Sequence, residues 1–558
     1  MSKKSPYESK IWLKNYDEGV PPKLPEPKSP LNKVLDDVAK EYPEKTAVVF
    51  YKRKITFREL KDYTDRLATA FVAMGIKKGD IIGLHMPNLP HYPITMWGAW
   101  KAGAVVMGVS PLMKERDLRH QLKDSGAKAV VSAEMYVKMV STIKPETKIE
   151  HVISAGLGDF PEGSLPKPKE IPGATHFIKL LTEYKPNPPP VQVDLKETPA
   201  FLQYTGGTTG LPKGAVITHY NHLSNMYQFT AWLKFKRGVE SVVSGFPYFH
   251  IAGTLTCTMS ILNAAQQALV VNPRDLPLIF QLVNEHKPTL LANVSTLYML
   301  MLRHPDFKKC DFSSVKYFIS AAAPFPAEVI KEFEKATGKR VIEAYGLTEC
   351  SPLVTANPVE HTRKIGSVGM PFPDTEIRIV ELGAKNKEVP LGEPGDLLVR
   401  GPQVFKGYLN RPEETRTSLV GDGWCRTGDV AKMDENGYIY IVDRTKDMIN
   451  VGGLKVYPRE VDDTLCEHPA VMMAATVGLT DPDRPGSERI KAFVVLKQGY
   501  EGTGKMEQEL IQFVKDRISP YKVPKYIEFR KELPLTLIGK VVKVSLREEE
   551  KTKAADQK

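Results

Sequence analysis

Long apolar runs are the first feature of which this sequence has little. Its longest apolar stretch, residues 103–109, is closed off by Lys101 and Pro111, whereas a membrane-spanning helix needs roughly 20 apolar residues. The N-terminus has basic residues but no apolar segment behind them, so we expect no secretory signal. The sequence therefore predicts a cytoplasmic protein without a transmembrane segment, and it leaves open a peripheral contact with a membrane.

Paired cysteines and dense basic clusters are missing as well. The five cysteines form no Cys-x-x-Cys pair, and no histidines gather at the spacing of a metal site, which argues against zinc and against a disulfide framework. The formal net charge is +11, but lysine and arginine are spread through the chain. Because nucleic-acid-binding modules concentrate their basic residues, we expect no nucleic acid partner, while a polyphosphate ligand fits the charge.

What the chain does have is length and a regular alternation of patterns. Its 558 residues, 42% hydrophobic and 26% charged, are enough for two or three globular domains. From about residue 40 to about residue 440, helical patterns alternate with β-branched runs, and the helix expected at 326–337 leads into a strand at 340–343. This alternation predicts an α/β fold with parallel sheets covered by helices, and ligands at the carboxyl ends of the strands.

The pattern changes near Asp443. About a hundred residues follow, including an expected helix at 508–517, and they are enough for a separate small domain. We therefore expect a large domain over 1–443 and a small α+β domain over 448–558. The C-terminal tail from Glu548 onward is polar and is expected to fray.

The sharpest motif is a glycine- and threonine-rich segment, residues 204–214 (YTGGTTGLPKG), which follows an expected strand at 200–203. Glycines let backbone N–H groups turn toward an anion, threonine hydroxyls donate to phosphate oxygens, and lysine adds positive charge. A P-loop would need Gly-Lys-Ser/Thr, whereas here Pro212 precedes the lysine and Gly214 follows it. The residues expected to hold phosphate are Thr205, Gly206, Gly207, Thr208, Thr209, Gly210 and Lys213.

This segment resembles the nucleotide-binding signature of the adenylate-forming superfamily, which includes acyl-CoA synthetases, luciferase and the adenylation domains of peptide synthetases. Other segments resemble further motifs of that superfamily, in the same order: 320–324 (SAAAP), 345–349 (YGLTE), 424–429 (WCRTGD), 443–455 (DRTKDMINVGGLK) and 534–540 (PLTLIGK). The resemblance covers nearly the whole chain. It implies ATP and Mg²⁺ as ligands, coenzyme A as co-substrate, and a mobile small domain joined by a hinge at 444–447.

The resemblance also implies the role of individual residues. Tyr345 would lie beside adenine, and Asp429 and Arg444 would bind the ribose. Glu349, helped by the Thr205 hydroxyl, would bind Mg²⁺, which prefers hard oxygen ligands. The other implied nucleotide-binding positions are Ala321, Ala322, Glu343, Ala344, Gly346, Thr348 and Lys446.

The C-terminal part would supply a catalytic lysine and the coenzyme A contacts. Lys540 would bring positive charge to the α-phosphate and the substrate carboxylate as negative charge develops, which is a large effect in a desolvated site. Gly452 and Gly453, with Lys455, would line the pantetheine tunnel after the small domain rotates, because glycine allows a thin ligand to approach closely.

Three positions depart from the pattern of the superfamily. Many members have two glycines where this chain has Ala321 and Ala322, and the added methyl groups are expected to shift the backbone of the adenine loop slightly. Many members have a basic residue where Asn450 stands. We therefore assign no charge-dependent role to position 450.

Residues 247–253 (PYFHIAG) occupy the substrate-selecting region of the superfamily. Amino-acid-activating members usually have an aspartate near here, and this chain has no carboxylate in the segment, which argues against amino acids. The next residues, 254–265, are small, apolar or uncharged; a helix of this kind suits an alkyl channel, and a plain core helix is the alternative. The expected acyl-pocket residues are Tyr248, His250, Gly253 and Cys257, and the expected catalytic residues are His250, Lys213, Glu349 and Lys540.

Trp12 with Tyr16, and the sequence Phe-Leu-Gln at 201–203, look most like long-chain fatty acyl-CoA ligases. The favoured function is therefore an AMP-forming ligase that activates a medium- to long-chain fatty acid and transfers it to coenzyme A. Three alternatives stay open: a coumarate-type aryl-acid CoA ligase, a luciferase-like oxygenase that uses the same adenylate, and a non-catalytic AMP-binding protein. Monomer and homodimer are both compatible with the sequence.

Overall fold

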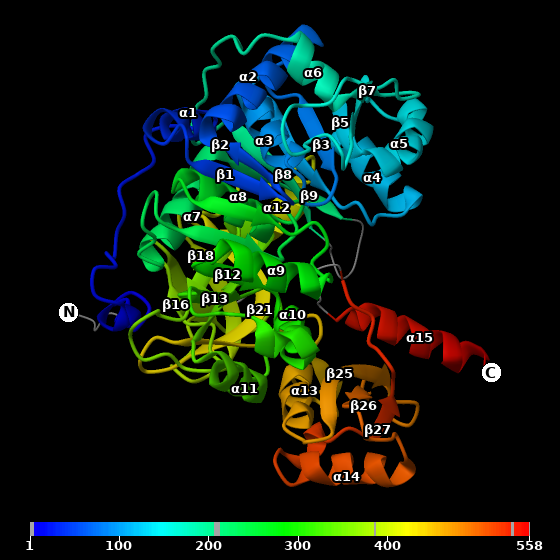
Figure 1. The fold of residues 1–558 in the computed structure, drawn as a ribbon. Coiled ribbons are helices and arrows are strands. Elements are labelled where there is room, and N and C mark those ends of the chain that lie inside the picture. Colours follow the sequence, from blue (N-terminus) through cyan, green and yellow to red (C-terminus); the bar gives the residue numbers. More distant parts are fainter. Residues whose placement is uncertain (1–4, 206–211, 384–386, 537–540, 557–558) are drawn as a thin grey trace.

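A large N-terminal part of sheets and helices is followed by a smaller C-terminal part, drawn in orange and red in Figure 1. This computed structural model describes residues 5–205, 212–383, 387–536 and 541–556. The predicted α/β fold with a large and a small domain is confirmed. Among the described residues, no helix is both long enough and apolar enough to cross a bilayer.

A nine-stranded sheet forms one layer of the large part. Its strands from β14 across to β1 run parallel, and the strands at its two edges run antiparallel. In sheet order the strands are β16 (Met370–Pro371), β15 (Leu353–Ala356), β14 (Val341–Gly346), β13 (Tyr317–Ser320), β12 (Leu290–Asn293), β10 (Ser241–Ser244), β11 (Gln266–Leu269), β1 (Thr46–Phe50) and β2 (Arg53–Thr56). The strand predicted at 340–343 is β14, which leads directly into the YGLTE segment.

An eight-stranded sheet forms a second layer. Six of its strands run parallel, while β9 and β19 are antiparallel additions at one edge. In sheet order the strands are β19 (Gly407–Tyr408), β9 (Lys213–Thr218), β8 (Pro199–Thr205), β4 (Val105–Val109), β3 (Ile81–His85), β5 (Ala129–Ala133), β6 (His151–Ala155) and β7 (Thr175–His176). The strand predicted at 200–203 is β8, and it ends at the start of the predicted phosphate motif.

Helices lie between and outside these two sheets (Figure 1). α7 (His219–Trp232) packs on β8 and β9, α8 (Ile251–Leu262) packs on β10 and β11, and the two helices pack on each other. α11 (Ala327–Thr337) follows Pro326 and ends at Gly338, whose φ of 68° provides a left-handed cap. The other helices of the large part are α1 (Leu31–Glu41), α2 (Phe57–Ala73), α3 (His91–Lys101), α4 (Glu115–Ser125), α5 (Val137–Ile143), α6 (Phe177–Glu183), α9 (Leu276–His286), α10 (Ser295–Arg303) and α12 (Pro412–Ser418).

A five-stranded antiparallel sheet completes the large part, and the sequence pattern, which indicates parallel sheets, does not predict it. Its strands are β17 (Glu376–Val380), β18 (Gly395–Arg400), β20 (Leu419–Val420), β21 (Trp424–Met433) and β22 (Ile439–Arg444). Antiparallel partners need no helical crossover between them, so the helix–strand alternation stops here. The sheet matters because β21 and β22 carry Asp429 and Arg444.

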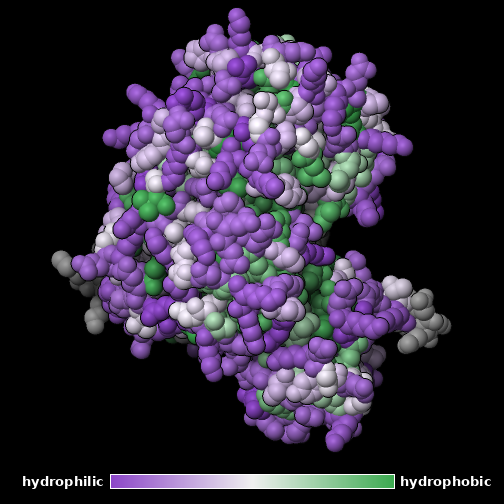
Figure 2. Space-filling model, in the orientation of Figure 1, coloured by the Kyte–Doolittle hydropathy of each residue, from purple (hydrophilic) through white to green (hydrophobic). Residues whose placement is uncertain are grey.

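The small C-terminal part has two sheets and its own buried core. β25 and β26 are antiparallel, and β26 and β27 are parallel neighbours joined through α14, which is the helix predicted at 508–517. Its elements are β23 (Ile449–Val451), β24 (Leu454–Val456), α13 (Pro458–Cys466), β25 (Val471–Thr480), β26 (Glu488–Leu496), α14 (Gly504–Lys515), β27 (Tyr526–Phe529) and α15 (Lys543–Asp556). The surface is hollowed between the large and small parts, and hydrophobic residues show along that hollow (Figure 2).

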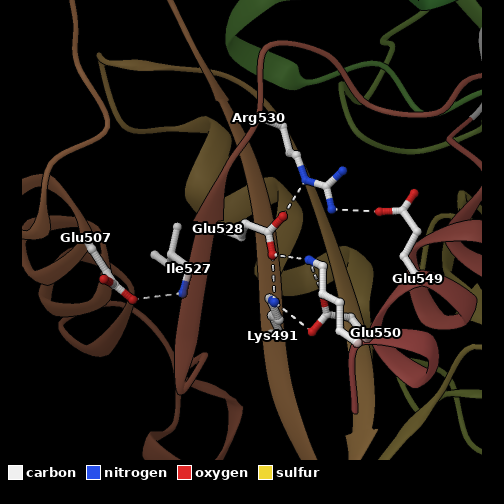
Figure 3. Close-up of polar contacts among 8 residues, drawn as sticks. Lys491, Glu507, Ile527, Glu528, Arg530, Glu549 and Glu550 are labelled. Atoms are coloured by element: carbon white, nitrogen blue, oxygen red, sulfur yellow. Dashed lines mark hydrogen bonds and ion pairs between the residues drawn. The ribbon is translucent and has the colours of Figure 1, made fainter. Parts of the chain in front are cut away.

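Residues 548–556 of the tail that was expected to fray are helical, as the larger part of α15, and residues 557–558 lie outside the described residues. An ion-pair cluster attaches this helix to β26 and β27 (Figure 3). Lys491 Nζ lies 2.7 Å from carboxylate oxygens of both Glu528 and Glu550. Arg530 lies 2.5 Å from Glu528 and 2.7 Å from Glu549. These pairs join residues distant in the sequence, so polar composition alone does not reveal the helix.

The ion-pair cluster makes a prediction about stability. Burial opposes it, but hydrogen bonds from Lys491 and Lys553 lower the pKa of Glu528 from 4.5 to about 2. A carboxylate with a lowered folded-state pKa contributes stability that is present above its usual pKa and lost as the pH falls through the folded value. Glu528→Gln should therefore reduce the free energy of unfolding at pH 7 by about 1 kcal/mol, a modest value because solvent screens these charges.

Urea unfolding at neutral pH and in steps below the usual carboxylate pKa of 4.5 measures the effect. The difference between variant and wild type should shrink as the pH falls toward 2. Glu501→Gln, at an exposed position before α14, is the control and should change little. An undiminished difference at the lowest pH would show that the charge of Glu528 is not the source of the stability.

Candidate active site

The clearest cluster is built around Asp429. Tyr345 lies near the end of β14, Asp429 lies within β21, and Arg444 is the last residue of β22, opposite Asp429 in the strand register. The Tyr345 hydroxyl donates a 2.5 Å hydrogen bond to Asp429 Oδ2, and Arg444 Nε lies 3.1 Å from Asp429 Oδ1. Three residues from separate predicted motifs therefore meet at one carboxylate.

Burial determines the electrostatics of this cluster. Asp429 is only 3% exposed, and a carboxylate in that position needs hydrogen bonds and an opposite charge. Burial, reinforced by Asp429, raises the pKa of the Tyr345 phenol far above its usual value, so Tyr345 remains a hydrogen-bond donor at neutral pH. The Asp429 carboxylate raises the pKa of Arg444. The carboxylate is thus held in one orientation, as an acceptor that suits hydroxyl groups.

Glu349 lies just beyond β14, in the short helix η5 (Thr348–Cys350). Its backbone carbonyl accepts a hydrogen bond of 2.8 Å from the N–H of Phe405, and its Oε1 accepts one of 2.5 Å from the Tyr408 hydroxyl. Lys213 Nζ lies 5.5 Å from the centre of the Tyr408 ring. The structure therefore brings Glu349 to the hydroxyl of Tyr408 and Lys213 over its ring.

Both ends of the glycine- and threonine-rich motif reach this region. Thr205, at the end of β8, pairs with Lys213 at the start of β9. The pKa of Arg444 is raised chiefly by Asp429, with a smaller contribution from the charge of Glu349. The predicted ligands Gly206, Gly207, Thr208, Thr209, Gly210 and Lys540 lie outside the described residues. Their roles stay predictions.

The predicted adenine loop follows β13. Ser320 ends this strand and pairs with Glu343 of β14, so Ala321 and Ala322 follow directly beside it. Ala322 has a φ of 70°, a left-handed conformation that costs a residue with a side chain roughly 1–2 kcal/mol. Burial raises the pKa of Glu343 to about 7. Nothing in these contacts tests adenine binding, which stays a prediction.

The other predicted positions in and just before the YGLTE segment, Ala344, Gly346 and Thr348, have backbone roles. Ala344 pairs with Ala356 of β15, and Thr348 begins η5. A Cβ atom at Gly346 would lie 2.0 Å from the carbonyl oxygen of Pro352. Only glycine lets the chain pass this carbonyl, so Gly346 permits the close passage that leads from β14 to η5 and Glu349.

The predicted acyl-pocket residues lie at the start of α8. His250 is the N-cap of this helix, and its Nδ1 accepts a hydrogen bond from the Ala252 N–H at 3.3 Å. The Tyr248 hydroxyl donates to Gln267 Oε1 at 2.6 Å, and burial raises the pKa of Cys257 to about 12. A Cβ atom at Gly253 would lie 2.1 Å from the Pro247 carbonyl oxygen, so this glycine is required by close packing.

These contacts leave the acyl pocket a prediction. Of the segment considered as a helix, 254–265, residues 254–262 are helical as part of α8 and residues 263–265 lie beyond its end; nearly all residues of α8 are buried. The loop before it rests on the eight-stranded sheet, because Gln203 Nε2 donates to the Phe249 carbonyl at 2.8 Å. This places His250 close to the carboxyl ends of β4 and β8. Both readings, pocket wall and core helix, agree with this burial.

The predicted coenzyme A residues lie on the small part. Gly452 and Gly453, with φ of 59° and 89°, form the two-residue turn between β23 and β24, and such turns need positive φ at both positions. The N–H of Gly452 donates to Ser487 Oγ, and that of Gly453 donates to Asn450 Oδ1, both at 2.9 Å. Lys455 is exposed on β24. These hydrogen bonds tie the turn to the small part, and its role in a tunnel stays a prediction.

The segment predicted to be a hinge adjoins the Asp429 cluster. Asp443 Oδ1 accepts from the Arg444 N–H at 2.7 Å, and its Oδ2 accepts from the N–H of Arg459, in α13, at 2.8 Å. Asp447 forms an ion pair of 2.7 Å with Arg547 of α15. Lys446 is exposed. The chain thus leaves the site at Arg444 and enters the small part directly.

Sequence reasoning missed Tyr408. The contact with Glu349 arises because β19 pairs with β9, which sets Tyr408 opposite Ala215, almost two hundred residues away in the chain. A tyrosine after a glycine gives no local indication of such a partner. The pairing of β19 with the strand that begins at Lys213 is the information that finds it.

Comparison with known proteins agrees with the family resemblance that the sequence motifs indicate. Residues 35–409 match the family described as AMP-binding enzyme, and residues 460–540 match the AMP-binding enzyme C-terminal domain. A long-chain-fatty-acid–CoA ligase of Bacillus subtilis (strain 168) is 37% identical over 561 residues, which cover 97% of this chain and 98% of the relative.

Solved structures agree with the fold. An anthranilate CoA ligase in complex with anthranoyl-AMP has a TM-score of 0.86 and 26% identity, and the match covers 95% of this chain and 99% of that one. ATP-bound MatB from Rhodopseudomonas palustris has a TM-score of 0.84 and 27% identity, over 93% and 98% of the two chains. With the Asp429 cluster in place and matches over most of its length, this chain belongs to the AMP-binding enzyme family.

Proposed function

We propose that this protein is an ATP-dependent, AMP-forming acyl-CoA ligase that acts on a medium- to long-chain fatty acid. The observation that carries the proposal is the meeting of Tyr345 and Arg444 at the Asp429 carboxylate. A buried, oriented carboxylate beside the end of β14 is suited to ribose hydroxyls. The long-chain fatty acid comes from the relative named above, which is 37% identical over nearly the whole chain.

The reaction has two steps. In the first, an oxygen of the substrate carboxylate attacks the α-phosphorus of ATP, and the bond to pyrophosphate breaks. In the second, the coenzyme A thiol attacks the acyl carbonyl, loses its proton, and AMP leaves. The first step needs mainly positioning and neutralisation of charge. We assign the neutralisation to Lys213 and Lys540, and the positioning of the nucleotide to Asp429 and Arg444.

The residues proposed for Mg²⁺ have suitable chemistry. A carboxylate and a hydroxyl are hard oxygen donors, which Mg²⁺ prefers. Thr205 ends β8, and Glu349 lies just beyond the end of β14, in η5. Glu349 Oε1 already accepts a hydrogen bond from Tyr408, which orients the carboxylate. When bound, Mg²⁺ offsets phosphate charge.

The cytoplasmic location of the protein and its state as a monomer or homodimer stay predictions from the sequence.

Turnover should release AMP and pyrophosphate, because the α-phosphorus is the reacting centre. A panel of short, medium and long fatty acids, coumarate and benzoate, assayed for coenzyme A-dependent AMP release, tests both the reaction and the substrate. Long acids should be used with the highest kcat/KM. ADP as the main nucleotide product would refute the ligase, and faster turnover of aryl acids would favour the aryl-acid alternative. Oxygen uptake with any acid would favour the oxygenase.

The two half-reactions should respond to different residues. Lys540→Ala should slow adenylation about 10²–10³-fold, as loss of a preorganised electrostatic group does, yet still transfer the acyl group from preformed acyl-AMP to coenzyme A. Gly453→Trp should spare pyrophosphate exchange and block thioester formation, because the bulk would fill the tunnel. This contrast is expected if the small domain turns about 444–447 between the steps.

The φ of 89° at Gly453 strains any side chain, so Gly453→Ala is the matched control. It carries the same backbone strain with little bulk. Thioester formation should fall far more in the tryptophan variant than in the alanine variant. Equal loss of both half-reactions in Lys540→Ala and Gly453→Trp would show that one rotating domain does not serve both steps.

Glu349→Gln should raise the Mg²⁺ concentration for half-maximal adenylation by about tenfold or more, since it removes a charged ligand while keeping the side chain's size. Magnesium titrations of pyrophosphate exchange measure this. Glu360→Gln is a control, because Glu360 is exposed and pairs with Lys234. An unchanged magnesium requirement in Glu349→Gln would remove Glu349 from the metal site.

A further inference from the structure

Strand β19 connects the proposed phosphate and metal regions. Its two residues pair with β9, which begins at Lys213. The adjoining Phe405 donates its N–H to the Glu349 carbonyl oxygen at 2.8 Å, so the same short segment also holds the backbone of η5. Any residue on β19 that reaches Glu349 therefore links two parts of the site that lie on different sheets.

Tyr408 is that residue. Its hydroxyl donates a 2.5 Å hydrogen bond to Glu349 Oε1. The other carboxylate oxygen, Oε2, takes no part in this hydrogen bond. The phenol is the donor in this contact and the carboxylate is the acceptor. A neutral phenol does not repel the carboxylate.

Contacts of the backbone and of the ring hold Tyr408 and with it the hydroxyl. The Tyr408 N–H donates to Thr415 Oγ1 at 2.9 Å, and the ring lies edge-on to Phe405 at 4.9 Å between centroids. Lys213 Nζ lies 5.5 Å from the ring centroid on a face of the ring. Because both backbone and ring are held, the hydroxyl adopts one position relative to Glu349.

We propose that Tyr408 is a positioning residue for the metal carboxylate: it occupies Oε1 of Glu349 and thereby presents Oε2 to Mg²⁺. Outer partners that hydrogen-bond a metal ligand orient it, and their loss typically reduces metal affinity about 10–100-fold. This proposal rests on the proposed function, because it takes Glu349 as a ligand of Mg²⁺. It adds that the β19–β9 pairing sets the geometry of that ligand.

Tyr408→Phe tests the proposal, because phenylalanine keeps the ring against Phe405 and beneath Lys213 and removes only the hydroxyl. We expect the Mg²⁺ concentration for half-maximal adenylation to rise about 10-fold or more, while kcat at saturating Mg²⁺ changes less. Binding of Mn²⁺ to protein loaded with a non-hydrolysable ATP analogue, measured by electron paramagnetic resonance, should weaken by a similar factor. This second readout does not depend on turnover.

Tyr440→Phe is the matched control. Its hydroxyl also meets a carboxylate, that of Asp434, at 3.4 Å, and its removal should leave both metal readouts unchanged. If Tyr408→Phe lowers kcat or the melting temperature while the Mg²⁺ requirement and Mn²⁺ affinity stay at wild-type values, Tyr408 is a structural brace and the proposal is overturned.

Glu349→Gln, and its combination with Tyr408→Phe, separates this proposal from the proposed function. If Tyr408 acts through Glu349, the double variant should require little more Mg²⁺ than Glu349→Gln alone. If Glu349→Gln raises the requirement and Tyr408→Phe does not, only the role of Tyr408 fails. If neither variant changes it, Glu349 is not a metal ligand, and both the metal assignment and this proposal fail.

Discussion

The buried carboxylate of Asp429 is the constraint on which the rest of the site depends. A charge of this kind is tolerated only when hydrogen bonds and an opposite charge replace water, and here Tyr345 and Arg444 do so. A buried acceptor left without its hydrogen-bond partner costs about 1–3 kcal/mol, and more where it is charged. This contact therefore couples the position of β14 to the positions of β21 and β22. It also holds the hydroxyl end of the Tyr345 ring, which is proposed to lie beside adenine.

The second constraint is the connection between the edges of the two largely parallel sheets. Each gains antiparallel strands at an edge, β15 and β16 on one and β9 and β19 on the other. β19 pairs with β9 beside the site, and Glu349 accepts a backbone hydrogen bond from the preceding Phe405 and a side-chain hydrogen bond from Tyr408 of β19. The ends of β8 and β14 are thereby joined through a short segment that belongs to neither parallel core.

Local patterns predicted much of this arrangement. The cap residues of α11 and the strand after it are readable because Pro326 and Gly338 have conformational preferences of their own. The antiparallel sheet of β17 to β22 was not predicted, since its pairings join distant residues without helices between them. For the same reason Tyr408 was missed and the C-terminal tail was expected to fray, although Lys491 and Arg530 fix it as α15. The motif residues were identified by their resemblance to the adenylate-forming superfamily. Only the folded structure shows which of these residues contact one another.

The proposed hinge begins at a residue that the site already uses. Arg444 is paired with Asp429, and the neighbouring Asp443 accepts hydrogen bonds from the N–H groups of both Arg444 and Arg459. The Arg459 side chain also donates to a backbone carbonyl of β22 at 2.8 Å. A rotation about 444–447 must therefore break the hydrogen bonds of Arg459 to β22, each worth about 1.5–3 kcal/mol where a charged group takes part. It can do so while the Arg444 pair stays intact. The nucleotide contacts would then remain in place as the small domain turns, which is the condition for using one site in two successive steps.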